Sequence, residues 1–332
     1  MEIALFEITD WEIDVLKKTL PKHKLHFFKT PVTESEISDI KNCEIISTFI
    51  YSKVDSKIIS QLPNLKFIET RSTGFNHIDL EECKKRKIIV SNVPSYGENT
   101  VAEHAFALIL SISRKIYKSY MRTMAEDYSI EGLEGFDLKG KKIGVVGTGR
   151  IGKHMIRIAQ GFEMTVLGFD AYPDKTLNKL EGFSYVSLDK LLKESDIITL
   201  HVPFTKENYH LIDEKAFAKM KNGAILINTA RGDLVDTKAL LKAITSGKLS
   251  GAGLDVIEGE EMIKEEKEIL HRHDTSAIKQ LLRDHNLMRN ESVVFTPHIA
   301  FYSREALERI LQTSIDNITS FIKKKPLNMV KV

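Results

Sequence analysis

The sequence predicts an α/β protein with two domains, each built around a parallel β-sheet. Two arrays of short apolar runs alternate with helical patterns, one in the first hundred residues and one from Lys142 onward. Strands that alternate with helices in this way form βαβ units, and the strands of such units run parallel. At 332 residues the chain is long enough to bury two separate hydrophobic cores.

The first array consists of apolar runs separated by amphipathic patterns. Strands are expected at Ile3–Glu7, Leu25–Phe28, Glu44–Phe49, Leu65–Glu69 and Ile88–Asn92, and helices at Trp11–Leu20, Glu34–Ile40, Ser56–Gln61 and Leu80–Arg86. A final helix, Arg304–Lys323, follows the second array and is expected to return to the first domain. We therefore expect a first domain of residues 1–98 plus 300–332 and a second of residues 99–299. Ligands are expected in an interdomain cleft.

The second array begins after an expected long helix, Thr100–Met121 with Asn99 as its N-cap, and a glycine-rich loop, Glu131–Gly140. Strands are expected at Lys142–Val146, Thr165–Phe169, Ile197–His201, Ala224–Asn228, Gly253–Val256 and Val293–Thr296. The segment from Glu258 to Asn290 has dense charge of both signs and no strand pattern. We interpret it as a surface excursion with one or two helices, for example Thr275–Arg283.

A glycine motif follows the first strand of this second array. Gly147, Gly149 and Gly152 fit G-x-G-x-x-G, and the residues from Arg150 to Gln160 can form the next helix. In that context the glycines allow a tight turn, the approach of a pyrophosphate and close helix–strand packing. Asp170 directly follows the next strand, where a carboxylate can bind both ribose hydroxyls. The pattern predicts a Rossmann-like/flavodoxin-like fold that binds a dinucleotide, and the carboxylate favours NAD over NADP.

The bulk composition excludes several classes of function. The formal net charge is only +2, and the basic clusters are short, so no nucleic-acid partner is expected. The longest apolar stretch, Ala105–Leu110, is too short to span a bilayer. Cys43 and Cys83 form no C-x-x-C pair, which is typical of reduced thiols. We expect a cytoplasmic protein.

Three residues at the ends of second-array strands are candidates for acid–base and anion-binding chemistry. Arg231 could hold a carboxylate through two parallel hydrogen bonds, and His298 could carry a proton near neutral pH. Glu260 lies five residues after Asp255 and could stabilise the imidazolium, with Glu258 and Glu261 as close rivals.

Metal binding is not expected. His271, His273, Asp274 and His285 could be considered as metal ligands, but they lie in a highly polar segment and lack tight ligand spacing.

Ordered motifs along nearly the whole chain resemble the NAD-dependent D-2-hydroxyacid dehydrogenases. The matching stretches are 71–79 (RSTGFNHID), 93–96 (VPSY), 101–104 (VAEH), the glycine motif with Asp170, 201–203 (HVP), 228–232 (NTARG), 254–256 (LDV) and 296–300 (TPHIA). Tyr51 and the sequence Ala300-Phe301-Tyr302 resemble the D-lactate dehydrogenase branch.

This resemblance implies roles for individual residues. The catalytic triad would be Arg231, Glu260 and His298. The implied cofactor contacts, beyond Gly147, Gly149 and Gly152, are Arg150, Ile151, Asp170, His201, Val202, Pro203, Thr229, Ala230, Asp255 and Ala300. The implied substrate-binding residues are Thr73, Gly74, Tyr51, Tyr96, Phe301 and Arg231.

The resulting hypothesis is reversible reduction of pyruvate to D-lactate with NADH, in a homodimer whose interface includes the helix from Thr100. A bulky Tyr51 would shrink the pocket toward a methyl-sized group. Two alternatives stay open. One is a dehydrogenase for a larger 2-hydroxy acid, such as 2-hydroxyisocaproate or phenyllactate, and the other is an NAD(H)-sensing binding protein of the same fold.

Overall fold

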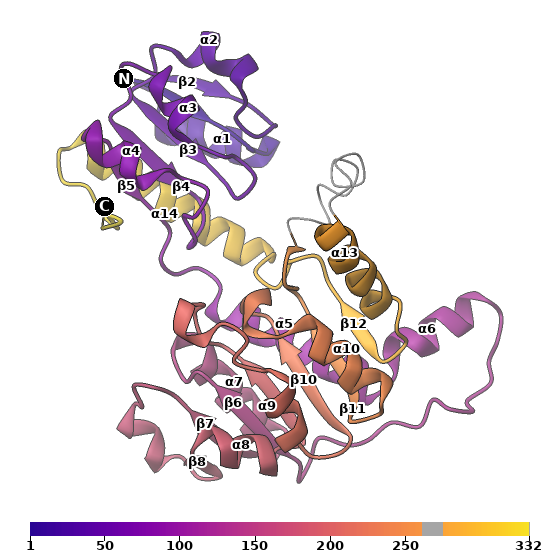
Figure 1. Cartoon of the computed structure of the whole chain (residues 1–332). Helices are drawn as coiled ribbons and strands as arrows, with labels where there is room; N and C mark the ends of the chain where they lie inside the picture. Colours follow the sequence, from indigo (N-terminus) through magenta and orange to yellow (C-terminus); the bar gives the residue numbers. More distant parts are fainter. Residues whose placement is uncertain (261–274, 332) are drawn as a thin grey trace. The chain divides into compact units, whose positions relative to one another are not determined.

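The computed structural model describes residues 1–260 and 275–331, and these fall into two compact units. Unit 1 comprises Met1–Gly97 and Ser303–Val332, and unit 2 comprises Glu98–Tyr302 (Figure 1). Each described unit contains a single parallel β-sheet with helices packed on it. The prediction of an α/β protein with two parallel sheets is therefore confirmed. No helix among the described residues combines the length and the apolar character needed to cross a bilayer.

Unit 1 has a five-stranded parallel sheet in the order β2-β1-β3-β4-β5. This order reverses direction between β1 and β3, as in flavodoxin-like sheets. The C-terminal helix α14 lies against β4 and α1, where Phe321 stacks on Phe67 with ring centroids 4.3 Å apart. The elements are β1 (Glu2–Leu5), α1 (Asp10–Thr19), β2 (Lys24–Phe27), α2 (Ile37–Ile40), β3 (Ile45–Thr48), α3 (Ser56–Ser60), β4 (Phe67–Thr70), α4 (Leu80–Lys85), β5 (Ile89–Ser91) and α14 (Arg304–Ile322).

Unit 2 has a seven-stranded parallel sheet in the order β12-β11-β10-β9-β6-β7-β8. The chain order reverses between β6 and β9, which is the switch point of a doubly wound Rossmann-like sheet and its usual ligand site. The elements are α5 (Glu98–Ser113), α6 (Ile116–Met124), β6 (Lys142–Val146), α7 (Arg150–Gly161), β7 (Thr165–Phe169), β8 (Phe183–Tyr185), α8 (Leu188–Glu194), β9 (Ile197–Leu200), α9 (Glu214–Lys219), β10 (Ala224–Asn228), α10 (Thr237–Thr245), β11 (Leu249–Leu254), α13 (Thr275–Met288) and β12 (Val293–Phe295).

The single long helix expected over Thr100–Met121 is wrong. The chain forms two helices, α5 and α6, and Lys115 between them has φ +55° in the left-handed region. The Ser113 carbonyl accepts the Phe136 N–H at 2.9 Å, so the distant 131–140 loop takes an acceptor that a continuous helix would use. Asn99 is also not an N-cap, because α5 already begins at Glu98.

Two strands of unit 2 differ from the expectation. β11 begins at Leu249 and ends at Leu254, earlier than the expected Gly253–Val256. Gly251 and Gly253 lie inside it because helix α5 packs closely here. A Cβ on either glycine would come within 2.9 Å of an α5 side chain. β8 was not expected at all, since it is a three-residue strand at the sheet edge.

Candidate functional site

The glycine turn between β6 and α7 has three distinct glycine environments. Gly147 has φ +92°, and a Cβ there would lie 2.6 Å from the His201 carbonyl oxygen. A Cβ on Gly152 would lie 2.1 Å from the Gly147 carbonyl oxygen, so helix α7 packs tightly against the turn. A Cβ on Gly149 would meet nothing within 4 Å. The turn thus has one open backbone position at the N-terminus of α7, which suits an approaching pyrophosphate.

Asp170 follows β7 and is bonded to this same turn. Its Oδ2 accepts the Thr148 N–H at 2.7 Å and the Thr148 hydroxyl at 3.1 Å, while Oδ1 accepts the Tyr172 N–H at 2.8 Å. The carboxylate is partly exposed beside the turn, where a ribose of a bound dinucleotide would lie. Arg150, at the start of α7, is exposed, with its Nη1 3.5 Å from Glu98 Oε1.

Two polar atoms at the ends of β9 and β10 are buried without a partner among the described residues. They are Nδ1 of His201 and the hydroxyl oxygen of Thr229. His201 binds the Thr199 hydroxyl through Nε2 at 2.8 Å, and burial lowers the pKa of His201 to about 3. The imidazole is therefore neutral at ordinary pH. Buried polar groups normally find partners, so these two atoms fit contacts to a bound cofactor.

His298 and Glu260 meet in the structure. His298 follows β12, and its Nδ1 lies 2.9 Å from Glu260 Oε1. The histidine has φ +55°, an uncommon backbone conformation for a residue with a side chain. Its side chain is about one-third exposed, so a substrate can reach the ring.

Asp255 holds the backbone that carries His298. Its carboxylate is buried and accepts the Thr296 hydroxyl at 2.5 Å, the Ile299 N–H at 2.9 Å and the Ala300 N–H at 2.8 Å. The Asp255 carbonyl also accepts the His298 N–H at 2.9 Å. These bonds fix the β12 loop before any ligand binds.

Glu258 and Glu261 were the alternatives to Glu260 as the partner of His298, and the contacts of Glu258 distinguish it from Glu260. Glu258 Oε1 accepts the Tyr209 hydroxyl and bonds His210 Nε2, both at 2.8 Å, whereas Glu260 bonds His298. The Tyr209 bond to Glu258 raises the pKa of Tyr209 to about 12. Glu261 lies outside the described residues, as do His271, His273 and Asp274.

Arg231 extends from the turn after β10. The turn is held by Asn228, whose amide donates to the Arg231 carbonyl at 2.8 Å and accepts the Ala230 N–H at 3.0 Å. A Cβ on Gly232 would lie 2.1 Å from the Ile257 carbonyl, so the turn packs on the segment leading to Glu260. The guanidinium is exposed, with one bond to the Ala230 carbonyl at 2.6 Å, and so keeps donors for an anion.

Unit 1 carries the expected substrate loop after β4. The Ser72 hydroxyl donates to the Gly74 carbonyl at 2.6 Å, and the Thr73 hydroxyl donates to the Val93 carbonyl at 2.9 Å. Within the described ranges, the N–H groups of Thr73 and Gly74 have no acceptor. Adjacent free N–H groups on a rigid turn suit a carboxylate.

The remaining predicted residues occupy varied environments. Tyr51 is 58% exposed in unit 1, and Tyr96 is half-buried there. In unit 2, Phe301 is half-buried and packs edge-on against Tyr302. Ile151, Val202, Pro203, Ala230 and Ala300 follow the ends of β6, β9, β10 and β12, at the carboxyl edge of the unit 2 sheet.

One group of residues in unit 1 has metal-ligating atoms within 4.8 Å of one another, namely Glu2, His26 and Cys43. Burial raises the pKa of Cys43 to about 12, which disfavours the thiolate that a metal needs. Lys24 Nζ already lies 3.2 Å from Glu2 Oε1. The group is better explained as an ion-paired sheet edge.

Comparison with known proteins decides the family. A sequence model described as "D-isomer specific 2-hydroxyacid dehydrogenase, NAD binding domain" matches residues 106–300. This chain belongs to the D-isomer-specific 2-hydroxyacid dehydrogenases. It is accordingly an NAD-dependent oxidoreductase that acts on the CH–OH group of D-2-hydroxy acids.

Individual members of this dehydrogenase family match over nearly their full length. D-lactate dehydrogenase of Escherichia coli K12 is 36% identical over 327 residues, covering 97% of each chain. A crystal structure of D-lactate dehydrogenase from Aquifex aeolicus with NAD and lactic acid has a TM-score of 0.83 and 38% identity, covering 97% of this chain and 96% of that one. A structure of D-2-hydroxyisocaproate dehydrogenase has a TM-score of 0.85 and 32% identity, covering 99% of each chain.

Sequence reasoning about the dehydrogenase missed two supporting residues. His104 on α5 has its Nε2 2.9 Å from the Thr296 hydroxyl and 3.5 Å from Asp255 Oδ1, which connects α5 to the His298 loop. Its place in the motif 101–104 was the available signal. Tyr209 was missed because its partner Glu258 is 49 positions away.

Proposed function

We propose that this dehydrogenase reduces pyruvate to D-lactate with NADH, and catalyses the reverse oxidation. The observation that carries the proposal is the 2.9 Å contact between His298 Nδ1 and Glu260 Oε1. It leaves Nε2 of the same ring to face a substrate oxygen. Relatives at 36–38% identity are named D-lactate dehydrogenases, and one was crystallised with NAD and lactic acid.

Arg231 and the backbone of Thr73 and Gly74 are proposed to hold the substrate carboxylate. A guanidinium binds a carboxylate with two parallel hydrogen bonds, and the two N–H groups supply further donors. This grip fixes the keto carbon, so that only one orientation of the carbonyl is productive.

His298 is proposed to transfer the proton. The adjacent Glu260 carboxylate stabilises the imidazolium, whose Nε2–H donates to the keto oxygen. Bound NADH supplies the hydride that reaches the carbonyl carbon. As negative charge develops on the oxygen, His298 delivers its proton, and in the oxidation direction the neutral ring accepts a proton from the hydroxyl.

The proposed cofactor contacts fit the chemistry of a dinucleotide. Gly149 leaves space at the N-terminus of α7 for the pyrophosphate, and Asp170 provides oxygens for the ribose hydroxyls. His201 and Thr229 each offer a buried polar atom that has no partner in the described part of the chain. A carboxylate at Asp170 repels a 2′-phosphate, which favours NAD over NADP.

The substrate test is NADH oxidation at neutral pH with pyruvate, 2-ketobutyrate, 2-ketoisocaproate, phenylpyruvate, glyoxylate and hydroxypyruvate. The proposal expects pyruvate to give the highest kcat/KM and D-lactate to be the product. A bulkier acid in first place would overturn the pyruvate assignment in favour of the larger-acid alternative. Tight NADH binding without turnover of any acid would favour the NAD(H)-sensing alternative.

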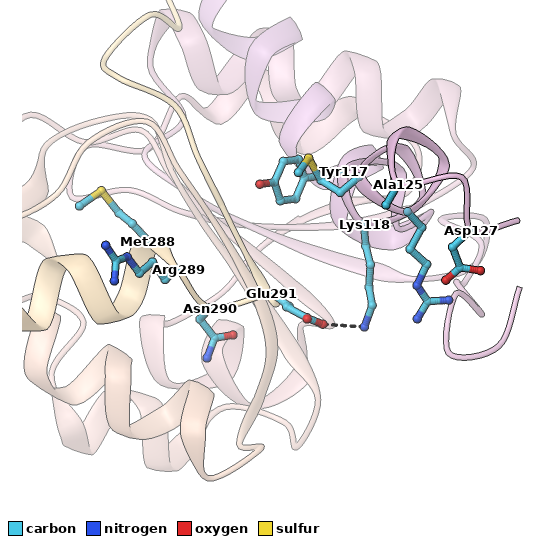
Figure 2. Close-up of a pocket in the computed structure, with 10 residues that line it drawn as sticks. Tyr117, Lys118, Ala125, Asp127, Met288, Arg289, Asn290 and Glu291 are labelled. Atoms are coloured by element: carbon cyan, nitrogen blue, oxygen red, sulfur yellow. Dashed lines mark ion pairs between the residues drawn. The ribbon is translucent and has the colours of Figure 1, made fainter. Parts of the chain in front are cut away.

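We also propose a homodimer, with α6 rather than the whole expected helix in its interface. No α6 side chain is buried, and Ile116, Tyr120 and Met124 are each more than half exposed. A cavity of about 580 Å³ lies beside α6, and two residues that line it, Lys118 and Glu291, form an ion pair at 2.7 Å (Figure 2). Exposed apolar side chains such as those of α6 mark association surfaces. Sedimentation should give a dimer for the wild type and a monomer for Tyr120→Glu, and a monomeric wild type would contradict the proposal.

A cytoplasmic location is likewise a proposal. Cys43 and Cys83 are both free thiols and both buried, as suits a reducing compartment. Cell fractionation tests it, and enrichment outside the cytoplasm would contradict it.

A further inference from the structure

One carboxylate holds the loop that carries Tyr51. The loop 49–52 follows β3, and three of its residues bond to Glu7 at the end of β1. Glu7 Oε2 accepts the Phe49 N–H at 2.9 Å, the Ser52 N–H at 3.1 Å and the Ser52 hydroxyl at 2.5 Å. Glu7 Oε1 accepts the Tyr51 N–H at 2.8 Å. One side chain, that of Glu7 in the segment after β1, thus accepts hydrogen bonds from the backbone of three residues of this loop.

Glu7 is itself held in an unusual backbone conformation. Its φ is +54°, in the left-handed region that is sterically costly for a residue with a Cβ. Arg71 Nη2 donates to the Phe6 carbonyl at 2.6 Å and to the Glu7 carbonyl at 3.0 Å. Non-glycine residues in this region persist where the surroundings force them, often near functional sites.

Arg71 connects Glu7 to the proposed carboxylate-binding loop. It is 2% exposed, sits at the end of β4, and directly precedes the loop 72–74. Its Nη1 donates to the Ser47 hydroxyl at 3.1 Å, and its guanidinium lies 5.8 Å from the centroid of the Phe49 ring. Arg71 therefore bonds the backbone of Glu7, lies near the Phe49 ring at the start of one loop, and directly precedes the other loop in the chain.

We infer that Glu7 and Arg71 are positioning residues for substrate selection, because they hold the Tyr51 loop in a fixed register with the loop 72–74. This inference rests on the proposed function, in which loop 72–74 binds the carboxylate and Tyr51 limits the group beyond the keto carbon. The distance between a carboxylate grip and an aromatic wall determines which side chain fits. A loosened Tyr51 loop admits larger 2-keto acids.

Glu7→Gln tests the inference with little change in shape. The amide oxygen can retain the three bonds at Oε2, while the NH2 group then faces the Tyr51 N–H at the Oε1 position. We expect the ratio of kcat/KM for pyruvate to kcat/KM for 2-ketoisocaproate to fall about tenfold. A tenfold change corresponds to the free energy of one charge-assisted hydrogen bond. Glu36→Gln is the matched control, because that carboxylate accepts the Thr33 N–H and hydroxyl elsewhere in unit 1. It should leave the ratio within twofold.

A double-mutant cycle separates positioning from general stability. If Glu7 acts through Tyr51, Glu7→Gln changes the ratio in the wild type but adds nothing in a Tyr51→Ala background. The same change in both backgrounds, or no change in either, overturns the inference. Ser52→Ala removes the hydroxyl that donates to Glu7 Oε2 and accepts the Val32 N–H at 3.1 Å. It provides a second variant should Glu7→Gln fold poorly, and it should lower the ratio in the same direction.

Hydrogen exchange gives a readout that needs no turnover. The Tyr51 amide should exchange at least tenfold faster in Glu7→Gln than in the wild type, while the Thr70 amide in β4 stays unchanged. Unaltered Tyr51 exchange overturns the positioning role. Failure of the wild type to turn over any keto acid would instead refute the proposed function, and the exchange result would still stand.

Discussion

Replacing Asp255 with asparagine should damage both the stability of unit 2 and the rate of the reaction. The carboxylate is 1% exposed and receives one bond at Oδ2, from the Ala300 N–H, and two at Oδ1, from the Thr296 hydroxyl and the Ile299 N–H. Asparagine has one acceptor oxygen and one NH2 group. Whichever way the amide turns, an N–H donor of the protein faces another donor.

The magnitude follows from those bonds. If the amide oxygen occupies the Oδ1 position, two hydrogen bonds weaken from charged to neutral, at about 1 kcal/mol each. The Ala300 N–H loses its acceptor, which costs about 1–3 kcal/mol in a buried setting. The free energy of unfolding should therefore fall by about 3–5 kcal/mol. Since this loop carries His298, a displacement near 1 Å would lower kcat by roughly 100-fold.

Urea denaturation and steady-state kinetics with pyruvate measure the two effects. Asp284→Asn is the matched control, because Asp284 is also a buried aspartate of unit 2 but receives only one described hydrogen bond, from Gln280. It should not lower stability at neutral pH. If the free energy of unfolding of Asp255→Asn lies within about 1 kcal/mol of the wild-type value and its kcat stays within twofold, the anchoring role is refuted.

Three further predictions concern other parts of unit 2. Gly152→Ala places a Cβ 2.1 Å from the Gly147 carbonyl oxygen, and we expect NADH binding, measured by fluorescence titration, to weaken at least about tenfold. Gly161→Ala is the control, because its Cβ meets nothing within 4 Å, and it should leave NADH binding unchanged. Burial raises the pKa of Asp284 to about 7, so the wild type loses stability as pH rises from about 4, where the unfolded carboxyl ionises, to about 7. Asp284→Asn should abolish this loss. Its free energy of unfolding, measured by urea denaturation, should exceed that of the wild type by at most about 4 kcal/mol at pH 8 and by nothing at pH 4. Equal gains at both pH values would contradict the prediction. Arg231→Lys keeps the charge but not the paired donors and should lower kcat/KM for pyruvate by about 10–100-fold, so an unchanged value would exclude the proposed carboxylate grip.

Features set by local sequence were predictable. The order strand, glycines, helix, strand and acid predicted the β6–α7–β7 unit, because each step depends on neighbours within about 25 residues of Gly147. The parallel arrangement of both sheets followed from the alternation of strands and helices, and the family resemblance came from ordered motifs.

Features set by long-range contacts were not predictable. The break between α5 and α6 depends on the Phe136 N–H reaching the Ser113 carbonyl, which no helical pattern reveals. Glu258 and Glu260 were equivalent by residue type and nearly so by position. The family resemblance alone favoured Glu260 at the level of sequence. The contacts that separate the two residues, Tyr209 with Glu258 and His298 with Glu260, form only in the folded chain.

The central claim is that His298, paired with Glu260, transfers the proton to the keto oxygen. The most direct test is the kcat of His298→Gln for pyruvate reduction, measured beside its Kd for NADH. The account predicts a kcat lower by about 10²–10⁴-fold, the usual contribution of a general acid, with NADH binding within twofold of the wild type. A variant that keeps its kcat within about tenfold would contradict the account, because another group would then be supplying the proton.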